Sequence, residues 1–249
     1  MWANHDMPMN TLNPHLFERG NSSVWSADVD WNNWTVMVER FIWQYFKKPN
    51  YFKLDGKPVF AIYFLDKLLE TFGDEDGIRK ALNYFDEEAK KAGFPGVHFQ
   101  LSGGVWTTEK HLHRIEAMGF HSIVPLTMGG IDRDYIKYCT NSIAIRERLS
   151  QALNIPFFPC ISIAYDDTPR FMDHQEDQVH FHRSPQAFAM LLAKTKEWVD
   201  NHPDQPKLML INAWNEWAED CYLLPDMNYG FGYLEAVKDV MNGRYEQYK

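Results

Sequence analysis

Two glutamates three positions apart, Glu216 and Glu219, are the residues whose type and spacing point most directly to chemistry. They lie in Ile211-Asn-Ala-Trp-Asn-Glu-Trp-Ala-Glu219, which runs from an apolar segment straight into polar and aromatic side chains. In a helical turn, carboxyl groups at this spacing lie on the same side. Two close carboxylates hold their protons with different affinities, so that one can act as an acid and the other as a base. Cleavage of a glycosidic bond needs such a pair.

The side chains beside the two glutamates suit a sugar ligand. We expect Trp214 and Trp217 to offer apolar ring faces and Asn215 to hydrogen-bond a sugar hydroxyl. A solvated surface turn is the common alternative for two neighbouring glutamates. Two observations favour a catalytic site: the tryptophans would expose large apolar rings to water on a solvated turn, and the glutamates follow an apolar strand.

Short β-rich runs alternate with longer helical patterns along the chain, which predicts βαβ units and a parallel sheet. Near-continuous apolar runs suit strands that are covered on both faces. The candidate strands are residues 58–64, 96–101, 121–126, 156–161 and 207–212, with residues 1–4 as the end of one more. The predicted helices are residues 31–46, 78–92, 109–118, 132–153, 185–201 and a last one from about 229 to 241.

The number of strands suggests an incomplete barrel. The sequence supplies six strand positions, the first only a stub, whereas a closed (β/α)8 barrel has eight. We therefore predict an α/β fold, a single (β/α)8 TIM-type barrel domain over residues 1–249 that lacks its first two strands. An N-terminal truncation or a start assigned too far downstream explains the gap best. Partner contacts that cover the open strand edges are the alternative.

In such barrels the functional site lies at the carboxyl ends of the strands, in the loops that follow them. In the loop after the fifth candidate strand we expect Asp166 to contact the sugar. Arg170 in the same loop either clamps a polar group or holds the loop by an ion pair, and we favour the ion pair. The predicted substrate-binding residues are Asn4, His5, Asp6, Tyr63, Trp106, Asp166, Arg170, Trp214, Asn215, Trp217 and Tyr222.

Composition excludes several classes of function. A net charge of -9 argues against a nucleic-acid partner, and no apolar run approaches the roughly 20 residues of a membrane-spanning helix. Three cysteines are too few for a disulfide framework. The spacing of His174, His180 and His182 matches no closed ligand set, so we predict neither a metal nor another cofactor.

The start of the sequence carries no secretory signal. As written, the chain is therefore expected in the cytoplasm, or in the periplasm or outside the cell if a leading segment is missing. The sequence gives no indication of the oligomeric state.

Several blocks of the sequence resemble a known family. Asn212-Ala-Trp-Asn-Glu-Trp-Ala-Glu219, followed by Tyr222-Leu-Leu-Pro-Asp226 and Tyr229-Gly-Phe-Gly-Tyr-Leu-Glu235, is similar to the closing block of the family 99-like glycoside hydrolases. The resemblance is greatest to the branch of WbsX-type polysaccharide-biosynthesis proteins. Trp2-Ala-Asn4, Tyr51-Phe-Lys-Leu-Asp-Gly-Lys-Pro-Val-Phe60 and Asp166-Asp-Thr-Pro-Arg170 follow the family's order, so the resemblance covers essentially the whole chain.

The resemblance implies a (β/α)8 barrel whose two N-terminal strands precede Met1, and an oligo- or polysaccharide substrate that includes α-mannosides in the characterised hydrolases. It also implies roles for the two glutamates. Glu216 would be the base that draws the proton from the sugar 2-hydroxyl, which attacks the anomeric carbon and gives an epoxide-like intermediate with net retention. Glu219 would be the general acid and then the base.

The sequence departs from the family pattern at three places. Ala218 stands where the hydrolases have His, and the opening loop reads His5-Asp6-Met7 where the WbsX-like pattern tends to have Glu-Asn-Trp. Asp220 stands where Gly often follows the second glutamate, and a third carboxylate there would raise the proton affinity of Glu219 or compete for its partner.

Two other functions stay open. A non-hydrolytic polysaccharide-biosynthesis protein, either a glycosyltransferase or a glycan-binding protein, is the main alternative to a hydrolase or transglycosylase. A nucleotide-sugar transferase would want an Asp pair after a strand, for which Asp166-Asp167 is the only candidate. An unrelated barrel enzyme with a metal-bound water is the third possibility.

Overall fold

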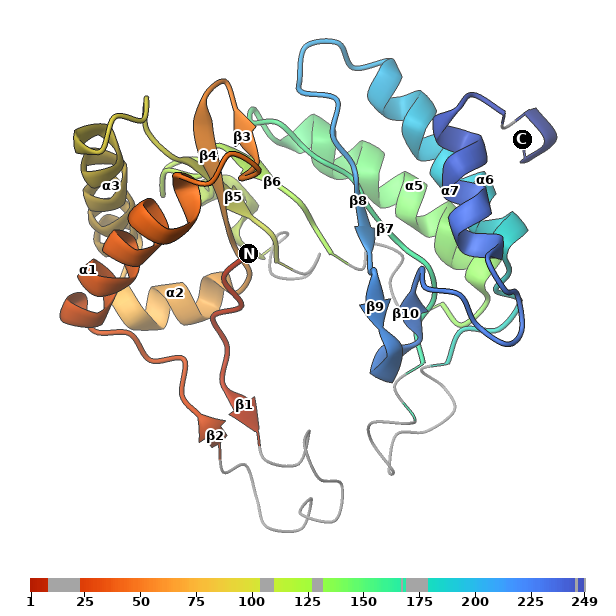
Figure 1. Cartoon of the computed structure of the whole chain (residues 1–249), viewed down its shortest axis with the longest axis horizontal. Coiled ribbons are helices and arrows are strands. Elements are labelled where there is room, and N and C mark those ends of the chain that lie inside the picture. The colour runs from red at the N-terminus through yellow and green to blue at the C-terminus, as the bar shows by residue number, and fades with distance from the viewer. Residues whose placement is uncertain are drawn as a thin grey trace. The chain divides into compact units, whose positions relative to one another are not determined.

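The computed structural model describes residues 1–8, 23–103, 110–126, 132–166, 168, 179–244 and 246–248. These residues form two compact units (Figure 1). Unit 1 holds the described residues up to Val124 together with Leu153–Pro156, and unit 2 holds those from Pro125 to Ala152 and from Phe157 onwards. That residues 1–249 form one barrel domain stays a prediction.

Unit 1 is built on a four-stranded sheet in the order β3 (Lys53–Leu54), β4 (Lys57–Ile62), β5 (His98–Leu101) and β6 (Ser122–Ile123). β3 and β4 form an antiparallel pair, whereas β4, β5 and β6 are parallel.

The stub predicted at residues 1–4 adds a further parallel contact to this sheet. The Trp2 N–H donates to the Ala61 carbonyl oxygen at 2.7 Å, and the Tyr63 N–H donates to the Trp2 carbonyl oxygen at 3.1 Å. The predicted succession of stub and three parallel strands is therefore confirmed in unit 1, with β5 and β6 shorter than predicted.

The helices of unit 1 follow the sequence prediction in part. α1 (Trp31–Arg40) continues as a π-helical turn (Phe41–Phe46), which together match the predicted helix 31–46. α3 (Glu75–Lys91) begins before the predicted residue 78, because the Asp74 carboxylate accepts the Gly77 N–H at 2.8 Å and caps the helix. α2 (Leu65–Phe72) was not predicted, and β1 (Met7–Pro8) pairs with β2 (Ser23–Trp25) outside the sheet.

The helix predicted at 109–118 is confirmed only in part: residues 110–111 are helical, Leu112–Arg114 form a 3-10 turn, and residues 115–119 are turns. Tertiary contacts of polar side chains explain the difference. The His111 Nε2 lies 2.8 Å from the Asp66 carboxylate, and the Arg114 guanidinium lies 3.1 Å from the Glu75 carboxylate.

Aromatic side chains form the core of unit 1. Phe85 of α3 stacks on Phe46 at a ring-centroid distance of 5.6 Å and contacts Phe60 of β4 at 5.0 Å, and all three are buried. Trp34 of α1 packs on Phe85 at 5.8 Å and donates its indole N–H to the Ala81 carbonyl oxygen at 3.1 Å. This layer joins α1 and α3 to the sheet.

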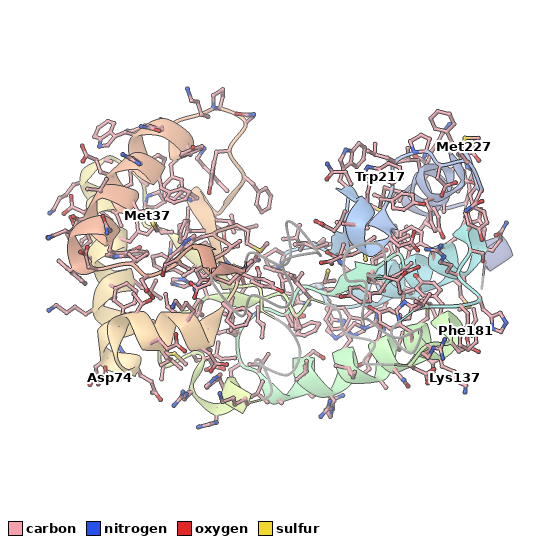
Figure 2. All side chains as sticks on the ribbon, turned by 90° about the horizontal axis from the view of Figure 1, so that it is seen from below. Met37, Asp74, Lys137, Phe181, Trp217 and Met227 are labelled. Carbon is pink, nitrogen blue, oxygen red and sulfur yellow. The ribbon has the colours of Figure 1, made fainter. Side chains whose placement is uncertain are left out.

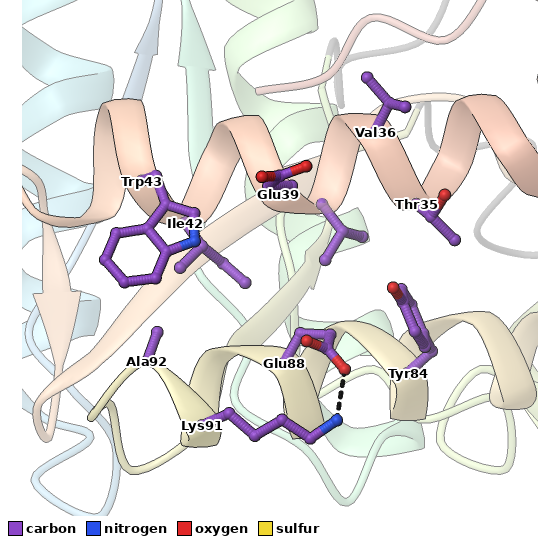
Figure 3. A pocket seen from close by; sticks show the side chains of 10 residues that line it. Thr35, Val36, Glu39, Ile42, Trp43, Tyr84, Glu88, Lys91 and Ala92 are labelled. Atoms are coloured by element: carbon purple, nitrogen blue, oxygen red, sulfur yellow. Dashed lines mark hydrogen bonds and ion pairs between the residues drawn. The ribbon is translucent and has the colours of Figure 1, made fainter.

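At the surface, α1 and α3 leave a groove of about 370 Å³ between them (Figure 3). Trp43, which is 60% exposed, and Glu39 line it from the α1 side. On the α3 side Glu88 accepts a hydrogen bond of 2.6 Å from Lys91. The groove lies on the helices, and unit 1 holds none of the predicted catalytic carboxylates.

Unit 2 contains the parallel strands β7 (Cys160–Ser162) and β8 (Leu210–Asn212), which pair in the register Cys160↔Leu210 and Ser162↔Asn212. β7 begins later than the predicted residue 156, because Pro156 and Pro159 have no N–H to donate to a neighbouring strand. The strands confirm the last two predicted strand positions.

Three helices accompany these strands: α5 (Tyr135–Ala152), α6 (Pro185–Asp200) and α7 (Gly232–Met241). A 3-10 turn, Glu246–Tyr248, follows α7. α6 begins as predicted, with Ser184 as its cap and proline at its first position. α7 begins later than the predicted residue 229, since the Asp226 carboxylate accepts the Tyr229 N–H and holds a turn there.

Both units thus show strands that neighbour one another in chain order, joined by helical connections, as expected of a (β/α) fold. Closure into an eight-stranded barrel and a missing N-terminal part stay predictions. Every helix among the described residues is too short or too polar to cross a lipid bilayer.

Candidate active site

Glu216 and Glu219 lie in a short hairpin that follows β8. β9 (Asn215–Glu216) pairs antiparallel with β10 (Cys221–Tyr222), and a 3-10 turn (Trp217–Glu219) connects them. The prediction that one helical turn carries both glutamates is wrong. Glu216 belongs to a strand, and only Glu219 belongs to the turn. Residues directly opposite in an antiparallel pair share a face. Glu216 therefore shares a face with Cys221, and Asn215 shares the other face with Tyr222.

Both carboxylates lie within electrostatic reach of the buried Cys221 thiol. Burial raises the pKa of Cys221 to about 12, and the charges of Glu219 and Glu216 add to the rise. The sulfur itself is fixed, because its S–H donates to the Ala164 carbonyl oxygen at 2.6 Å. Glu216 is exposed and Glu219 is half-buried. The hairpin thus carries two acidic groups on adjacent elements and gives them different exposure, which is an arrangement that acid–base chemistry uses.

The loop after β7 supports the turn that carries Glu219. The Asp166 N–H donates to the Glu219 carbonyl oxygen at 2.9 Å. The Asp166 carboxylate accepts the Thr168 N–H at 3.0 Å and its hydroxyl at 2.6 Å, which shapes its own loop. The structure therefore brings Asp166 to the turn that carries Glu219, and its contact with a sugar stays a prediction.

Asp220 ends the turn in the left-handed backbone conformation, with φ at 56°. Glycine adopts this conformation without strain, which gives a physical reason for the glycine often found there in the resembling family, and Asp tolerates it better than most residues. The Asp220 carboxylate forms an ion pair with Arg183, and their side chains are only 14% and 29% exposed. A cation therefore compensates the third carboxylate beside Glu219.

Aromatic side chains flank the hairpin. Trp217 stacks on Tyr222 with ring centroids 4.0 Å apart, and Trp217 and Trp214 are 48% and 58% exposed. Figure 2 shows the Trp217 side chain projecting from this segment. The Tyr222 hydroxyl donates to Asp226 at 3.1 Å, which fixes the ring beneath the indole. Asn215 is exposed on the Tyr222 face of the hairpin. These groups offer ring faces and a polar amide to a ligand.

Unit 1 holds a second group of the predicted residues, at the carboxyl end of β4. Asn4 is buried and pairs with the Phe64 backbone, donating to its carbonyl oxygen at 2.8 Å and accepting its N–H at 2.7 Å. The His5 ring lies 5.8 Å from that of Tyr63, and the Asp6 carboxylate accepts the Ala27 N–H at 2.7 Å.

Asn4 and Asp6 thus hold backbone in place, whereas the contact of this group with a substrate stays a prediction. Trp106 and Arg170 lie outside the described residues.

An ionic cluster near the same end of β4 was not predicted as part of a site. His111 is buried, and Arg114 donates to its Nδ1 at 3.1 Å, so the ring hydrogen lies on Nε2 and is donated to Asp66 at 2.8 Å. Asp66 stands two residues after the predicted strand 58–64, and this position could have marked it as a candidate site residue. Arg183 was also missed, and nothing in its local sequence marks it.

The histidines considered as metal ligands have separate surroundings. His180 is buried with its ring centroid 4.6 Å from that of Tyr138, and burial and the charge of Arg183 lower its pKa to about 4. His182 is exposed beside Asp134 at 3.4 Å, and His174 lies outside the described residues. Among the described residues, no cluster of three or more His, Cys, Asp or Glu side chains could hold a metal ion.

Parallel strands alternating with helices, and a carboxylate-bearing hairpin directly after the last of them, define an α/β protein of the (β/α) type. The chain belongs to the glycosyltransferase WbsX family, whose model matches residues 1–237. The predicted family is therefore confirmed.

The chain is also similar to individual proteins. The GH99 endo-alpha-mannosidase from Bacteroides thetaiotaomicron superposes with a TM-score of 0.58 at 14% identity, over 88% of this chain and 63% of that chain, a similarity that establishes the fold. Two Xanthomonas campestris pv. campestris proteins, from strains B100 and ATCC 33913 and each named "Uncharacterized protein WxcX", are 32% identical over 85 residues. That match covers 34% of this chain and 12% of the length of each relative.

Proposed function

We propose that this chain is a glycan-active enzyme that breaks the glycosidic bonds of an oligo- or polysaccharide, as a hydrolase or a transglycosylase. The observation that supports it best is the hairpin directly after β8, which carries Glu216 on β9 and Glu219 on the turn that follows. The exposed Trp217 beside them supplies a ring face for a sugar.

In the proposed reaction, Glu216 takes the proton of the sugar 2-hydroxyl. The freed oxygen attacks the anomeric carbon, and the bond to the leaving oxygen breaks as Glu219 protonates it. The product is an epoxide-like sugar. Glu219, now a carboxylate, takes a proton from an incoming hydroxyl that opens the epoxide at the anomeric carbon, and Glu216 returns its proton to O2. Two inversions give net retention.

Hydrolysis and transfer differ only in the incoming hydroxyl, which belongs to water in the first case and to a second sugar in the other. The name of the family favours transfer, and the similarity to an endo-alpha-mannosidase favours hydrolysis of α-mannosides. A non-catalytic glycan-binding protein of polysaccharide biosynthesis is the alternative function.

The decisive experiment compares the wild type with Glu216→Gln and Glu219→Gln on α-mannans and bacterial surface polysaccharides. We expect each variant to lose at least about a hundredfold in kcat/KM, since general acid–base catalysis contributes about 10²–10⁴-fold. On an aryl glycoside with a good leaving group, Glu219→Gln should keep the first step, whereas Glu216→Gln should not. A 2-O-methyl substrate should be inert because it has no 2-hydroxyl proton.

The results separate the alternatives. Adding an acceptor oligosaccharide and analysing products by mass spectrometry distinguishes transfer from hydrolysis. Wild-type activity in either glutamine variant overturns the catalytic assignment. If the wild type binds a polysaccharide but turns over none of these substrates, the result supports the glycan-binding alternative.

A further inference from the structure

The turn that carries Glu219 is held by contacts at Glu219 itself and at Asp220, the next residue. At Glu219, the backbone carbonyl oxygen accepts the Asp166 N–H at 2.9 Å. After it, the carboxylate of Asp220 pairs with Arg183 while its backbone stays left-handed at φ 56°. A residue held in this way fixes the direction in which the chain leaves Glu219.

Arg183 comes from a distant part of the sequence, directly before Ser184, the cap of α6. Its own backbone is fixed, because its carbonyl oxygen accepts the Tyr229 hydroxyl at 3.0 Å. Tyr229 in turn donates its N–H to the Asp226 carboxylate at 2.5 Å, and that carboxylate also accepts the Tyr222 hydroxyl. The segment that follows the hairpin therefore holds Arg183, and the Arg183 side chain reaches back to the hairpin.

This ion pair differs from the exposed pairs of the helices. Its side chains are 14% and 29% exposed, whereas Lys91 and Glu88 of α3 are 68% and 30% exposed. Exposed pairs contribute little to stability, but removing one partner of a shielded pair leaves an uncompensated charge. That charge would stand next to Glu219 in the chain.

We propose that Arg183 and Asp220 form a positioning pair that places Glu219 and sets the charge it experiences. The inference rests on the proposed function of Glu219 as general acid. Neither residue is catalytic itself. Arg183 holds the side chain of Asp220, and Asp220 ends the turn that carries Glu219.

Several ionisable groups surround this turn and contribute to its charge balance. Among the described residues they are Glu216 on β9, Cys221 and Tyr222 on β10, Asp166 on the loop after β7, Asp226 after the hairpin, Arg183 before α6, and His180 and Tyr233, on which the charge of Arg183 acts. Replacing Arg183 leaves the negative charge of Asp220 unpaired, and replacing Asp220 leaves the positive charge of Arg183 unpaired.

The charge argument fixes the sign of each effect. In Arg183→Gln the Asp220 carboxylate is unpaired, so it raises the pKa of Glu219. A general acid works while protonated, so the alkaline limb of the pH profile of kcat/KM moves to higher pH. In Asp220→Asn the Arg183 cation is unpaired, which moves that limb to lower pH. We expect shifts of about half to one pH unit.

The experiment measures pH profiles on an unactivated glycan for Arg183→Gln, Asp220→Asn, the double variant and Arg183→Lys. The two single variants should shift in opposite directions, with kcat reduced about tenfold because Glu219 is less well placed. The double variant should return the limb close to its wild-type position, and Arg183→Lys should keep it. Lys91→Gln is the control, since it breaks the exposed pair with Glu88 on α3.

Shifts in the same direction, or unshifted profiles, overturn the positioning pair. If Arg183→Gln fails to fold in a thermal unfolding test, Asp220→Asn and the double variant still decide the sign. Wild-type activity of Glu219→Gln instead rejects the proposed function, so the two failures are distinguishable.

Discussion

The Trp217 indole stacks on the Tyr222 ring across the hairpin that carries the two glutamates, with centroids 4.0 Å apart and planes inclined by 26°. Tyr222 is itself anchored through its hydroxyl to Asp226. Trp217 is therefore oriented on a fixed base and remains 48% exposed. A sugar that stacks on this indole meets a ring whose position is set before binding, which reduces the entropy cost of association.

Replacing Trp217 with alanine should weaken oligosaccharide binding about tenfold, which corresponds to about 1.4 kcal/mol. Trp217→Phe should retain part of the affinity because it keeps a ring face. Isothermal titration with the oligosaccharide products measures both variants.

Trp43→Ala is the matched control for this binding prediction. Trp43 is 60% exposed but lines the groove between α1 and α3 in unit 1 (Figure 3). Equal losses of affinity in both variants would show that Trp217 has no special part in binding the glycan.

A substitution of Asn4 can distinguish a structural role of this residue from the predicted contact with substrate. Its amide makes two hydrogen bonds with the Phe64 backbone and is buried. Asn4→Ala leaves the Phe64 N–H without its partner and removes one of the two donors to the Phe64 carbonyl oxygen, which should cost about 1–3 kcal/mol in the free energy of unfolding. Urea denaturation measures this cost. Unchanged stability together with a raised KM would instead favour direct contact with the substrate.

The sequence predicted elements best where one helical face is apolar. In the predicted helix 31–46, Trp34, Val38, Ile42 and Phe46 recur every fourth residue, and the structure buries all four. All four residues remain buried although the α-helix changes to a π-helical turn, because burial depends on which side of the helix faces the core and not on the exact helical pitch. Leu65 and Leu68 of α2 are three residues apart, which is also a helical spacing, and both are buried, so this missed helix was readable.

The site was less predictable because its geometry depends on long-range contacts. The residue types and their place after the last strand were readable, but the register Cys221↔Glu216 gives the hairpin its two faces. No local pattern shows that Asp220 adopts a left-handed conformation or that Arg183 pairs with it. Such contacts join segments distant in sequence, and a single sequence carries no record of them.

Phe85 lies at the centre of the aromatic core of unit 1, within 6 Å of the rings of Phe46, Phe60 and Trp34. Phe85→Ala should lower the free energy of unfolding by about 3–5 kcal/mol, since it removes buried surface and leaves a cavity. Phe85→Leu should cost less because it refills most of the volume. Phe52→Ala, at a ring that is 51% exposed, serves as the control in the same chemical denaturation experiment. A small effect of Phe85→Ala would contradict the proposed packing.

His98 makes the stability of unit 1 depend on pH. Its Nε2 lies 2.7 Å from the Ser122 hydroxyl, and burial, together with the charges of His121 and Lys57, lowers its pKa to about 4. Asp55 opposes this shift without cancelling it. The ordinary value is 6.5, so between pH 6.5 and 4 the unfolded chain binds more protons at this position than the folded chain.

The free energy of unfolding should therefore fall as the pH is lowered from 6.5 to 4, and His98→Gln should reduce the slope of that fall. Urea denaturation at a series of pH values measures the slope. His180, whose pKa is also lowered to about 4 by burial and by Arg183, should contribute a separate and additive part in unit 2. Below pH 4 the slope due to His98 should vanish, because both states are then protonated. A wild-type slope in His98→Gln would show that this imidazole is accessible to protons in the folded chain.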